Sequence, residues 1–446
     1  MIKRTLAVIA ACLLANAAVV TAQDAKGQHE ILQQTKTAGL RINDHPQAQW
    51  FPDAGLGLFV HFGLAAIDGG IDLSWGMRAN KSWDDGELPP TKYWALADGW
   101  NPRKFNPDKF IRQAKEAGFK YAVFTTKHHD GYTMWPSKYS DFGVGQKMGG
   151  RDLVKEFTDA CHKYGLKCGL YFSPPDWYFD REYISFGKKG NLYYDYNHNF
   201  VEKLPSKPKG WNEKRKAMIK NQLEELLTDY GRIDLLFFDG GQAEVSNDWV
   251  RELQPGIVIN RRNKQPGDYN DSEGALPTKR FYGWFETNDT CWPSNKWSYS
   301  TCSPMDTGED VIEKLVKVRA WGGNYLANVG PAPDGSIPKE ALEAWKEIGK
   351  WMKHSGESIY GTTAGTWPES CNTPMTVKED DGVFYLHAFP NKQGAIKVWN
   401  LEKKPQKAIL LRTGEEIPFE YSDATLSLKI FPQERTRQVD VVKVIF

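Results

Sequence analysis

Short apolar runs alternate with amphipathic stretches between about residue 50 and residue 355. Apolar residues recur at helical spacing over residues 153–164 and 218–230, and a glycine, Gly165 or Gly231, follows each stretch, as is common where a helix ends. This alternation of strands and helices predicts βα units and a parallel sheet. The expected strands lie at residues 56–62, 121–126, 168–172, 235–238, 257–260, 281–285 and 325–329.

Two classes of fold share this alternation, the doubly wound sheet and the (β/α)8 barrel. The chain has 446 residues, and no Gly-x-Gly-x-x-Gly turn follows the first expected strand. Both observations favour a barrel. We therefore predict an α/β fold with a (β/α)8-type TIM barrel over residues 23–360.

The pattern changes after a helix expected at residues 338–354. Five strand-like runs follow, at residues 383–389, 395–399, 408–411, 426–431 and 439–446, without helical spacing between them. Such a run of strands predicts an antiparallel β-sandwich over residues 361–446.

The first residues have the organisation of a signal peptide. Lys3 and Arg4 precede an apolar run from Leu6 to Val20, and small residues end at Ala22, so we expect residues 1–22 to direct export to the periplasm or the medium. Lipoprotein processing at Cys12 is the alternative. It is less favoured because the apolar run continues beyond that cysteine.

Net charge and cysteine spacing argue against several classes of ligand, namely nucleic acid, anionic lipid and zinc. Loss of Lys3 and Arg4 changes the formal net charge from +1 to −1, which leaves no overall basic field to attract nucleic acid or anionic lipid. No later segment has the 18 or more apolar residues of a membrane span. The cysteines show no Cys-x-x-Cys spacing, which argues against a zinc site, although a bridge between Cys291 and Cys302 stays open.

Polar residues follow the expected strands one after another. In a parallel barrel the carboxyl ends of all strands meet on one face, so we expect these residues to converge on a single pocket. They are His61, His128-His129-Asp130, Ser173, Asp239, Arg261-Arg262 and Glu286.

Two carboxylates in this series suit acid–base chemistry on a glycoside. Asp239 ends a buried run and precedes Gly240, so it suits a nucleophile. Glu286 follows an aromatic run whose apolar character is expected to raise its pKa, as a general acid requires. Three other carboxylates are close enough in sequence to replace it, namely Asp271, Glu273 and Asp289.

Neither a metal nor another cofactor is expected. His128 and His129 are neighbours at a strand end and should point to opposite sides, and no His-x-x-x-His helix accompanies them. Imidazoles both donate and accept hydrogen bonds, which suits sugar hydroxyls. Arg262 is expected to keep Asp239 ionised by charge pairing.

Several stretches of the chain resemble glycoside hydrolase family 29, the α-L-fucosidases, and together they extend over residues 48–362. The most specific are Lys127-His128-His129-Asp130-Gly131 and the Gly-Gly-Asn to Gly-Pro stretch at residues 322–331. Further similarity lies at residues 50–63, 116–131, 169–173, 237–239 and 260–262.

The resemblance implies a retaining mechanism with Asp239 as nucleophile and Glu286 as acid/base, although the acid/base position varies between branches of the family. It also implies a fucose-binding set of His61, His128, His129, Tyr171 and Arg262, with Trp297 lining the pocket. Three departures concern the substrate. Lys92 stands where a Glu is frequent, Phe237 replaces a frequent Trp, and Lys296-Trp-Ser-Tyr299 differs from the usual motif.

We therefore expect a secreted enzyme that releases α-linked L-fucose from fucosylated oligosaccharides or polysaccharides. One alternative is an α-L-galactosidase, because L-galactose is L-fucose with a hydroxyl on C6, and a polar residue near C6 would favour it. The other alternative is a glycan-binding protein without turnover, against which the two carboxylates argue.

Overall fold

The computed structural model describes residues 40–79, 87–276, 283–430 and 435–446. The expected signal peptide lies outside these residues, as do Phe281 and Tyr282 of one expected strand. No helix in the described ranges is long and apolar enough to span a membrane.

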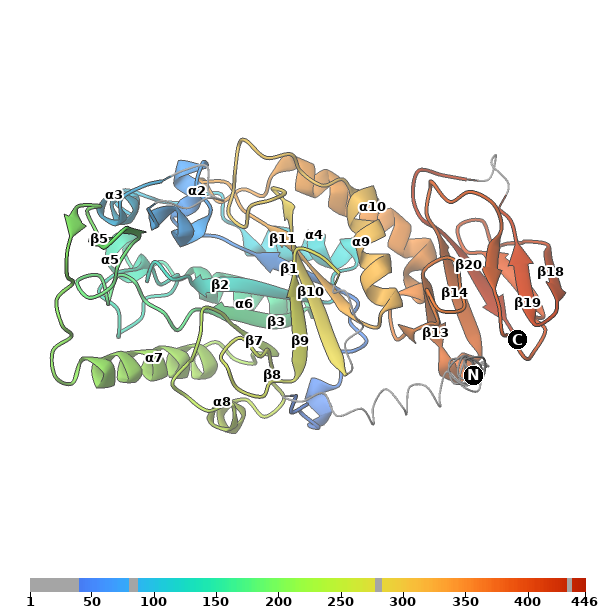
Figure 1. Cartoon of the computed structure of the whole chain (residues 1–446), viewed down its shortest axis with the longest axis horizontal. Helices are drawn as coiled ribbons and strands as arrows, with labels where there is room; N and C mark the ends of the chain where they lie inside the picture. The colour runs from blue at the N-terminus through green and yellow to red at the C-terminus, as the bar shows by residue number, and fades with distance from the viewer. Residues whose placement is uncertain (1–39, 80–86, 277–282, 431–434) are drawn as a thin grey trace, which may run out of the picture.

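A parallel eight-stranded sheet forms the larger part of the molecule (Figure 1). Its edge strands approach each other where the backbone N–H of Asp268 donates to the Ile259 carbonyl at 2.7 Å and the Asp268 carboxylate accepts from the Ile259 N–H at 2.6 Å. These contacts nearly close the barrel, and the predicted fold class is confirmed. In sheet order the strands are β8 (Val258–Ile259), β7 (Leu235–Phe238), β3 (Lys167–Phe172), β2 (Tyr121–Lys127), β1 (Leu56–Val60), β11 (Asn324–Val329), β10 (Trp284–Trp292) and β9 (Tyr269–Glu273).

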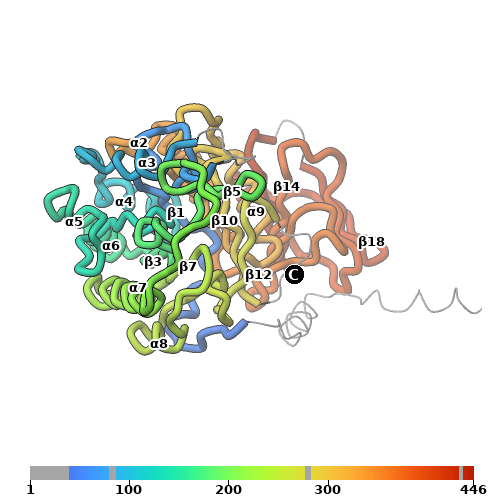
Figure 2. Tube along the Cα trace, turned by 60° about the vertical axis from the view of Figure 1, so that its left-hand side comes forward, coloured from blue at the N-terminus to red at the C-terminus, as the bar shows by residue number. Residues whose placement is uncertain are grey.

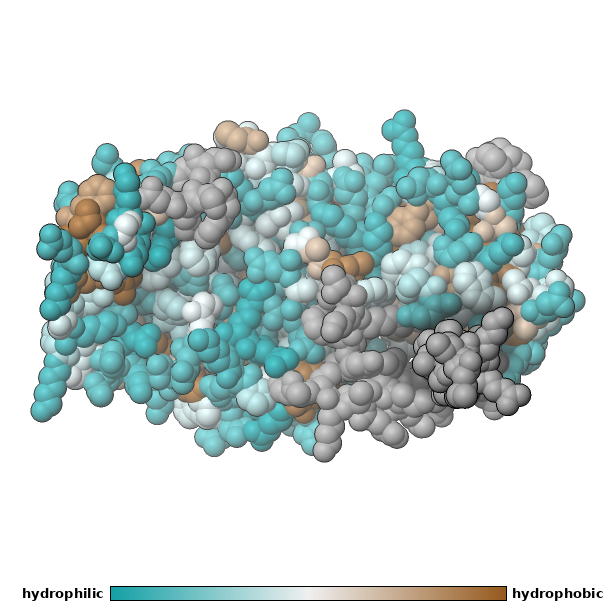
Figure 3. Space-filling view, viewed as in Figure 1, coloured by the Kyte–Doolittle hydropathy of each residue, from teal (hydrophilic) through white to brown (hydrophobic). Residues whose placement is uncertain are grey.

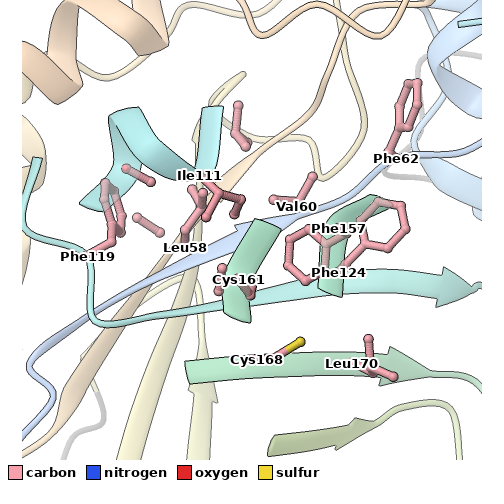
Figure 4. Close-up of a cluster of buried hydrophobic side chains, with 14 of the residues drawn as sticks. Leu58, Val60, Phe62, Ile111, Phe119, Phe124, Phe157, Cys161, Cys168 and Leu170 are labelled. Atoms are coloured by element: carbon pink, nitrogen blue, oxygen red, sulfur yellow. The ribbon is translucent and has the colours of Figure 1, made fainter. Parts of the chain in front are cut away.

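Helices cover much of the outside of the barrel, and Figure 2 shows α4, α6, α7 and α8 on one side of the strands and α9 on the other. Phe124 of β2 and Phe157 of α6 stack at 5.1 Å in this outer layer (Figure 4). Among the described residues, no helix separates β8 from β9 or β9 from β10. The long helices are α4 (Pro107–Ala117), α6 (Leu153–Tyr164), α7 (Trp211–Thr228), α8 (Asn247–Leu253), α9 (Gly308–Ala320) and α10 (Lys339–Ser355).

Aromatic and aliphatic side chains fill the inside of the barrel. Phe59, Val123, Phe237 and Leu326 belong to one buried cluster. Phe51, from the segment before β1, lies 4.6 Å from the Tyr269 ring and 6.2 Å from the Tyr121 ring. Because Tyr121 and Tyr269 begin their strands, these rings form the floor of the barrel at the amino ends.

Short elements on the loops after β1, β2 and β3 cover the opposite, carboxyl end of the barrel. In Figure 1 this end lies at the left, away from the C-terminal sheets at the right. The elements are α2 (Ala65–Asp68), α3 (Pro90–Ala95), α5 (Val144–Lys147) and the small sheet of β4 (Lys188–Lys189), β5 (Leu192–Tyr194) and β6 (Phe200–Val201).

The C-terminal part consists of two antiparallel sheets around a separate apolar cluster. It packs on the barrel through α10, where the Trp351 indole N–H donates to the Val439 carbonyl at 2.7 Å. The first sheet contains β12 (Thr363–Ala364), β13 (Met375–Lys378), β14 (Val383–Ala388), β20 (Asp440–Ile445), β16 (Lys407–Leu410) and β17 (Glu415–Glu416). The second contains β15 (Ile396–Val398), β19 (Thr425–Leu428) and β18 (Phe419–Ser422).

Candidate active site

Asp239 directly follows β7 and lies at the carboxyl end of the barrel. The Tyr171 hydroxyl of β3 donates to its Oδ2 at 2.9 Å, and Arg262 donates to its Oδ1 at 3.2 Å. Burial raises the pKa of Asp239, but the Arg262 charge, His129 and the Tyr171 hydroxyl outweigh burial, so the pKa lies below its ordinary value. Asp239 is therefore ionised and oriented, as a nucleophile must be.

Arg262, just after β8, holds three carboxylates on one guanidinium. Besides Asp239 it contacts Asp271 at 2.5 Å through Nε and Glu273 at 3.0 Å through Nη2. Burial lowers the pKa of Arg262, but Asp271 and Asp239 raise it beyond its ordinary value, so the guanidinium stays charged. The Phe237 ring lies 5.2 Å from this guanidinium. Phe237, one of the departures from the family pattern, therefore packs against Arg262.

His61, which directly follows β1, is a neutral imidazole oriented to accept a hydrogen bond through Nε2. Its Nδ1 lies 2.7 Å from Oδ1 of Asn328, and the Asn328 amide donates to the Trp297 carbonyl at 2.8 Å. Because an amide oxygen only accepts, Nδ1 carries the proton and Nε2 is left as an acceptor. Burial lowers the pKa of His61 to about 4, against the effect of the Asn328 hydrogen bond.

His128 and His129 lie 4.2 Å apart between ring centroids, and serines hold them in place. His128 Nδ1 lies 2.5 Å from the Ser74 hydroxyl, and His129 Nδ1 lies 2.5 Å from the Ser173 hydroxyl. Gly240 has a φ of +82°, and a Cβ there would lie 2.4 Å from the His129 ring. A glycine after Asp239 is therefore required to admit His129.

Tyr171 and Trp297 complete the pocket. The Tyr171 ring stacks 5.7 Å from His128, and the Trp297 ring lies 4.9 Å from His61. The structure thus brings together six residues singled out from the sequence as binding the sugar, namely His61, His128, His129, Tyr171, Arg262 and Trp297. Lys92 is exposed on α3, while the neighbouring Tyr93 is buried and donates to Asp130 at 2.8 Å.

Within the described ranges, two groups of side chains have donor atoms close enough for a metal ion. One consists of His128, His129 and Asp239, whose ligand atoms lie within 4.8 Å of one another and belong to the pocket just described. The other contains Asp289 and Asp306, but Lys314 contacts both, at 2.9 and 2.6 Å, and its ammonium occupies the place of a cation.

Glu286 does not join Asp239 at the carboxyl end. Strand β10 runs from Trp284 to Trp292, so Glu286 is its third residue rather than the residue after a strand, and the expected strand at residues 281–285 had the wrong end. Its carboxyl group accepts a hydrogen bond from Tyr121 in the floor of the barrel, and the residue is 0% exposed. A carboxyl group enclosed there does not meet a substrate at the opposite end.

The enclosed carboxyl makes stability depend on pH. Burial raises the pKa of Glu286 to about 8, against the effect of the Tyr121 hydrogen bond. The folded state therefore keeps the Glu286 carboxyl protonated, whereas the unfolded chain releases this proton near pH ~4. The stability of the folded state consequently falls as pH rises towards 8. Because glutamine keeps the neutral form, we expect Glu286→Gln to raise the melting temperature relative to wild type more at pH 8 than at pH 5. Equal differences at both pH values would contradict a buried, protonated Glu286.

Of the three alternative carboxylates, Glu273 has the geometry of a general acid. It is the last residue of β9, at the same end as Asp239, and its side chain is 49% exposed. The Asp271 side chain is only 10% exposed and is bound to Arg262. Asp289 is tied to Lys314 and to the Tyr325 hydroxyl at 2.9 Å. Of the three, Glu273 alone combines an exposed side chain with a contact to the guanidinium that binds Asp239.

The roles of several residues that shape this pocket could not be predicted from the sequence pattern. Ser74 belongs to a short helical turn far along the chain from His128, and Asn328 lies inside an apolar strand. The motif at residues 322–331 contains Asn328, but the role of Asn328 becomes visible only from its contact with His61.

The disulfide between Cys291 and Cys302 that the sequence left open is not formed, because both cysteines are free.

A parallel barrel with an ionised carboxylate at its carboxyl end, a second carboxylate on the same guanidinium and a histidine-rich pocket is the arrangement of a glycoside hydrolase. The family described as Alpha-L-fucosidase matches residues 20–357. Since this match spans most of the chain, the chain belongs to the α-L-fucosidase family, glycoside hydrolase family 29. It is therefore an enzyme that releases fucose from glycosides.

Relatives and solved structures agree with this assignment. Tissue alpha-L-fucosidase of Bos taurus is 30% identical over 351 residues, which cover 72% of this chain and 70% of the relative. Alpha-L-fucosidase isoenzyme 1 from Paenibacillus thiaminolyticus superposes with a TM-score of 0.76 at 28% identity, over 90% of this chain and 98% of that chain. A Bacteroides thetaiotaomicron alpha-L-fucosidase superposes with a TM-score of 0.75 at 28% identity, over 91% and 97% of the two chains.

Proposed function

We propose that the protein is an exo-acting, retaining α-L-fucosidase in which Asp239 is the nucleophile and Glu273, in place of Glu286, is the acid/base. The observation that carries this proposal is the Arg262 guanidinium, which contacts Asp239 and Glu273 through its two terminal nitrogens at 3.2 and 3.0 Å. Two carboxylates held by one guanidinium are close enough to serve one glycosidic bond. Retaining enzymes need such closeness, because their carboxyl groups lie only ~5 Å apart.

The Bacteroides thetaiotaomicron relative supports the covalent route. Its structure is described as a trapped covalent intermediate with 2-fluoro-fucosyl fluoride, obtained in a variant with a glutamate replaced by glutamine. A covalent intermediate belongs to double displacement, and the replacement of a glutamate accords with a glutamate acid/base. We extend both features to this chain.

In the first step a carboxylate oxygen of Asp239 attacks the anomeric carbon, and the bond to the leaving oxygen breaks. Glu273 gives its proton to that oxygen, which departs as a neutral alcohol. In the second step Glu273 takes a proton from water, whose oxygen attacks the anomeric carbon and releases Asp239. Two inversions leave the fucose with its original configuration.

In this mechanism, Arg262 and the Tyr171 hydroxyl have the role of stabilising the Asp239 carboxylate as it leaves again. His61 presents an acceptor nitrogen, and the paired rings of His128 and His129 supply further groups for the sugar hydroxyls. The Trp297 and Tyr171 rings offer apolar faces for the C–H groups of the sugar. These contacts all serve one terminal sugar, which is why we propose exo action.

Hydrolysis of paired nitrophenyl α-L-fucoside and α-L-galactoside by the purified mature protein tests this function. We expect turnover of the fucoside that does not change when a chelator is added, because the proposed steps use only side chains. Preference for the galactoside would move the substrate to L-galactose. Inhibition by the chelator would instead assign a metal to His128, His129 and Asp239.

The site of action is proposed to be outside the cytoplasm. The apolar run from Leu6 to Val20 with Lys3 and Arg4 before it supports export and removal of residues 1–22. Mass spectrometry of the protein from its native cells is expected to find an N-terminus at Gln23. An acylated N-terminal Cys12 would indicate a lipoprotein instead.

A further inference from the structure

A groove lies outside the catalytic pocket, between the loops after β2 and β3 and one face of α7. Its lining combines aromatic, cationic and amide side chains, among them Tyr139, Phe179, Arg181, Trp211, Lys214 and Asn221. The α7 residues recur at positions 211, 214, 217, 218 and 221, which lie on one side of a helix. The surface over α7, at the lower left of Figure 1, is mainly hydrophilic in Figure 3.

The aromatic rings in the groove are held in place and open to solvent in part. The Trp211 and Phe179 ring centroids lie 4.6 Å apart, and the Trp211 indole N–H donates to Asp180 at 2.7 Å. Tyr139 is 44% exposed, which is uncommon for a large ring in this molecule. Fixed aromatic faces beside polar groups suit the alternating C–H and hydroxyl surfaces of a sugar.

Two cations in the groove have no carboxylate partner among the described residues. Arg181 donates to the Tyr178 carbonyl, with its guanidinium 4.4 Å from the Tyr178 ring, and Lys214 makes no ion pair there. By contrast Lys216, on the same helix, lies 3.4 Å from Glu244. The groove therefore keeps positive charge available to a ligand.

The carboxylates that line the groove do not cancel this charge. Asp176 is buried and paired with the Lys127 ammonium at 3.1 Å, so its charge is already balanced from inside the protein. Asp141 is exposed and is the one remaining acidic group among the described residues that line the groove. Two free cations against one free carboxylate favour an anionic ligand.

A short segment separates the groove from the catalytic pocket. The Trp177 ring lies 5.3 Å from the His129 ring, and its backbone N–H donates to the His129 carbonyl at 2.7 Å. The residues on either side of it, Asp176 and Tyr178, line the groove. A chain whose terminal fucose enters the pocket can therefore continue across this segment.

We propose that the groove binds a sugar residue that carries a sulfate or carboxylate group, in the part of the substrate chain beyond the fucose. This inference rests on the proposed function and specifies its substrate as an anionic fucosylated polysaccharide. Arg181 and Lys214 would bind the anionic group, and Tyr139 and Trp211 would pack against the sugar ring.

The test compares KM and kcat on a small aryl α-L-fucoside, a neutral fucosylated oligosaccharide and the same oligosaccharide carrying either a sulfate or a uronic acid. Lys214→Gln is expected to raise KM for one or both anionic substrates about tenfold, and the two anionic arms identify the group. Tyr139→Ala is expected to raise KM for them as well. All kinetics on the aryl fucoside should stay unchanged, because that substrate does not reach the groove.

Matched controls are Lys216→Gln, an exposed lysine on another side of α7, and Phe200→Ala, an aromatic residue on β6 that is 50% exposed. Both should leave every KM unchanged. Unchanged KM values in the two groove variants, or equal effects in the controls, would overturn the proposal. So would an effect of Tyr139→Ala confined to the neutral oligosaccharide.

Direct binding separates this proposal from the proposed function. Titration calorimetry with the anionic oligosaccharide lacking its fucose should show binding to wild type that weakens with added salt and in Lys214→Gln. Absence of binding would overturn the groove proposal even when the aryl fucoside is hydrolysed. Binding without hydrolysis would instead contradict the enzymatic mechanism.

Discussion

Asp239→Ala is expected to lower kcat on nitrophenyl α-L-fucoside by about 10⁴-fold or more, because removal of a nucleophile leaves only binding and orientation. Added azide should restore turnover, since the small anion fits where the carboxylate was removed and attacks the same carbon. The azide product should have inverted configuration, because only one displacement then occurs. Kinetics with and without azide, followed by NMR of the product, measure both effects.

Asp248→Ala is a suitable control for this experiment. Asp248 is an exposed aspartate on α8 that pairs with Arg41 at 2.6 Å, and its loss should leave kcat unchanged. Full activity in Asp239→Ala, or azide products of unchanged configuration, would remove Asp239 from the role of nucleophile.

Glu273→Gln is expected to reduce kcat/KM on a fucosylated disaccharide by about 10²–10⁴-fold, the usual contribution of a general acid. The loss should be much smaller for the first step on a nitrophenyl fucoside, because nitrophenolate leaves without a proton. Steady-state kinetics on both substrates from pH 4 to about 9 measure these effects.

Glu286→Gln serves as the matched control, since it makes the same chemical change on the neighbouring strand. Because Glu286 lies in the floor of the barrel, its variant should keep the dependence on leaving group and pH seen in wild type. If Glu286→Gln shows the selective loss on the disaccharide and Glu273→Gln does not, the acid/base is Glu286 and the proposed mechanism is wrong.

Apolar strands were predictable from the sequence, because a strand buried on both faces leaves a nearly continuous hydrophobic run. β1, β2, β3, β7 and β11 all have this pattern. β9 was missed because it reads Tyr269-Asn-Asp-Ser-Glu273, with polar side chains that contact Arg262 and Thr287 rather than a core. The end of β10 was misplaced because the residues from Glu286 to Thr290 are polar although the strand continues to Trp292, and the prediction therefore placed Glu286 at the wrong end of the barrel.

The sugar pocket could be predicted to the extent that its residues follow apolar strands. His61, His128, His129 and Asp239 all do, and the barrel then brings them together. The role of Asn328 depends on contact with His61, 267 residues away along the chain. Hydrogen bonds between such distant positions leave no periodic pattern in a sequence.

The wall of the barrel that carries Glu273 has no outer helix in the described part of the chain, whereas β7, which carries Asp239, is backed by Ile219 and Leu223 of α7 in the main core. The two carboxylates therefore differ in how firmly packing holds the strands that carry them. A change in length near β9 alters the reach of the acid with little loss of buried contacts, while a shift of β7 disturbs the core. The core thus fixes the position of Asp239, whereas the position of Glu273 relative to Asp239 is more tolerant of insertions and deletions.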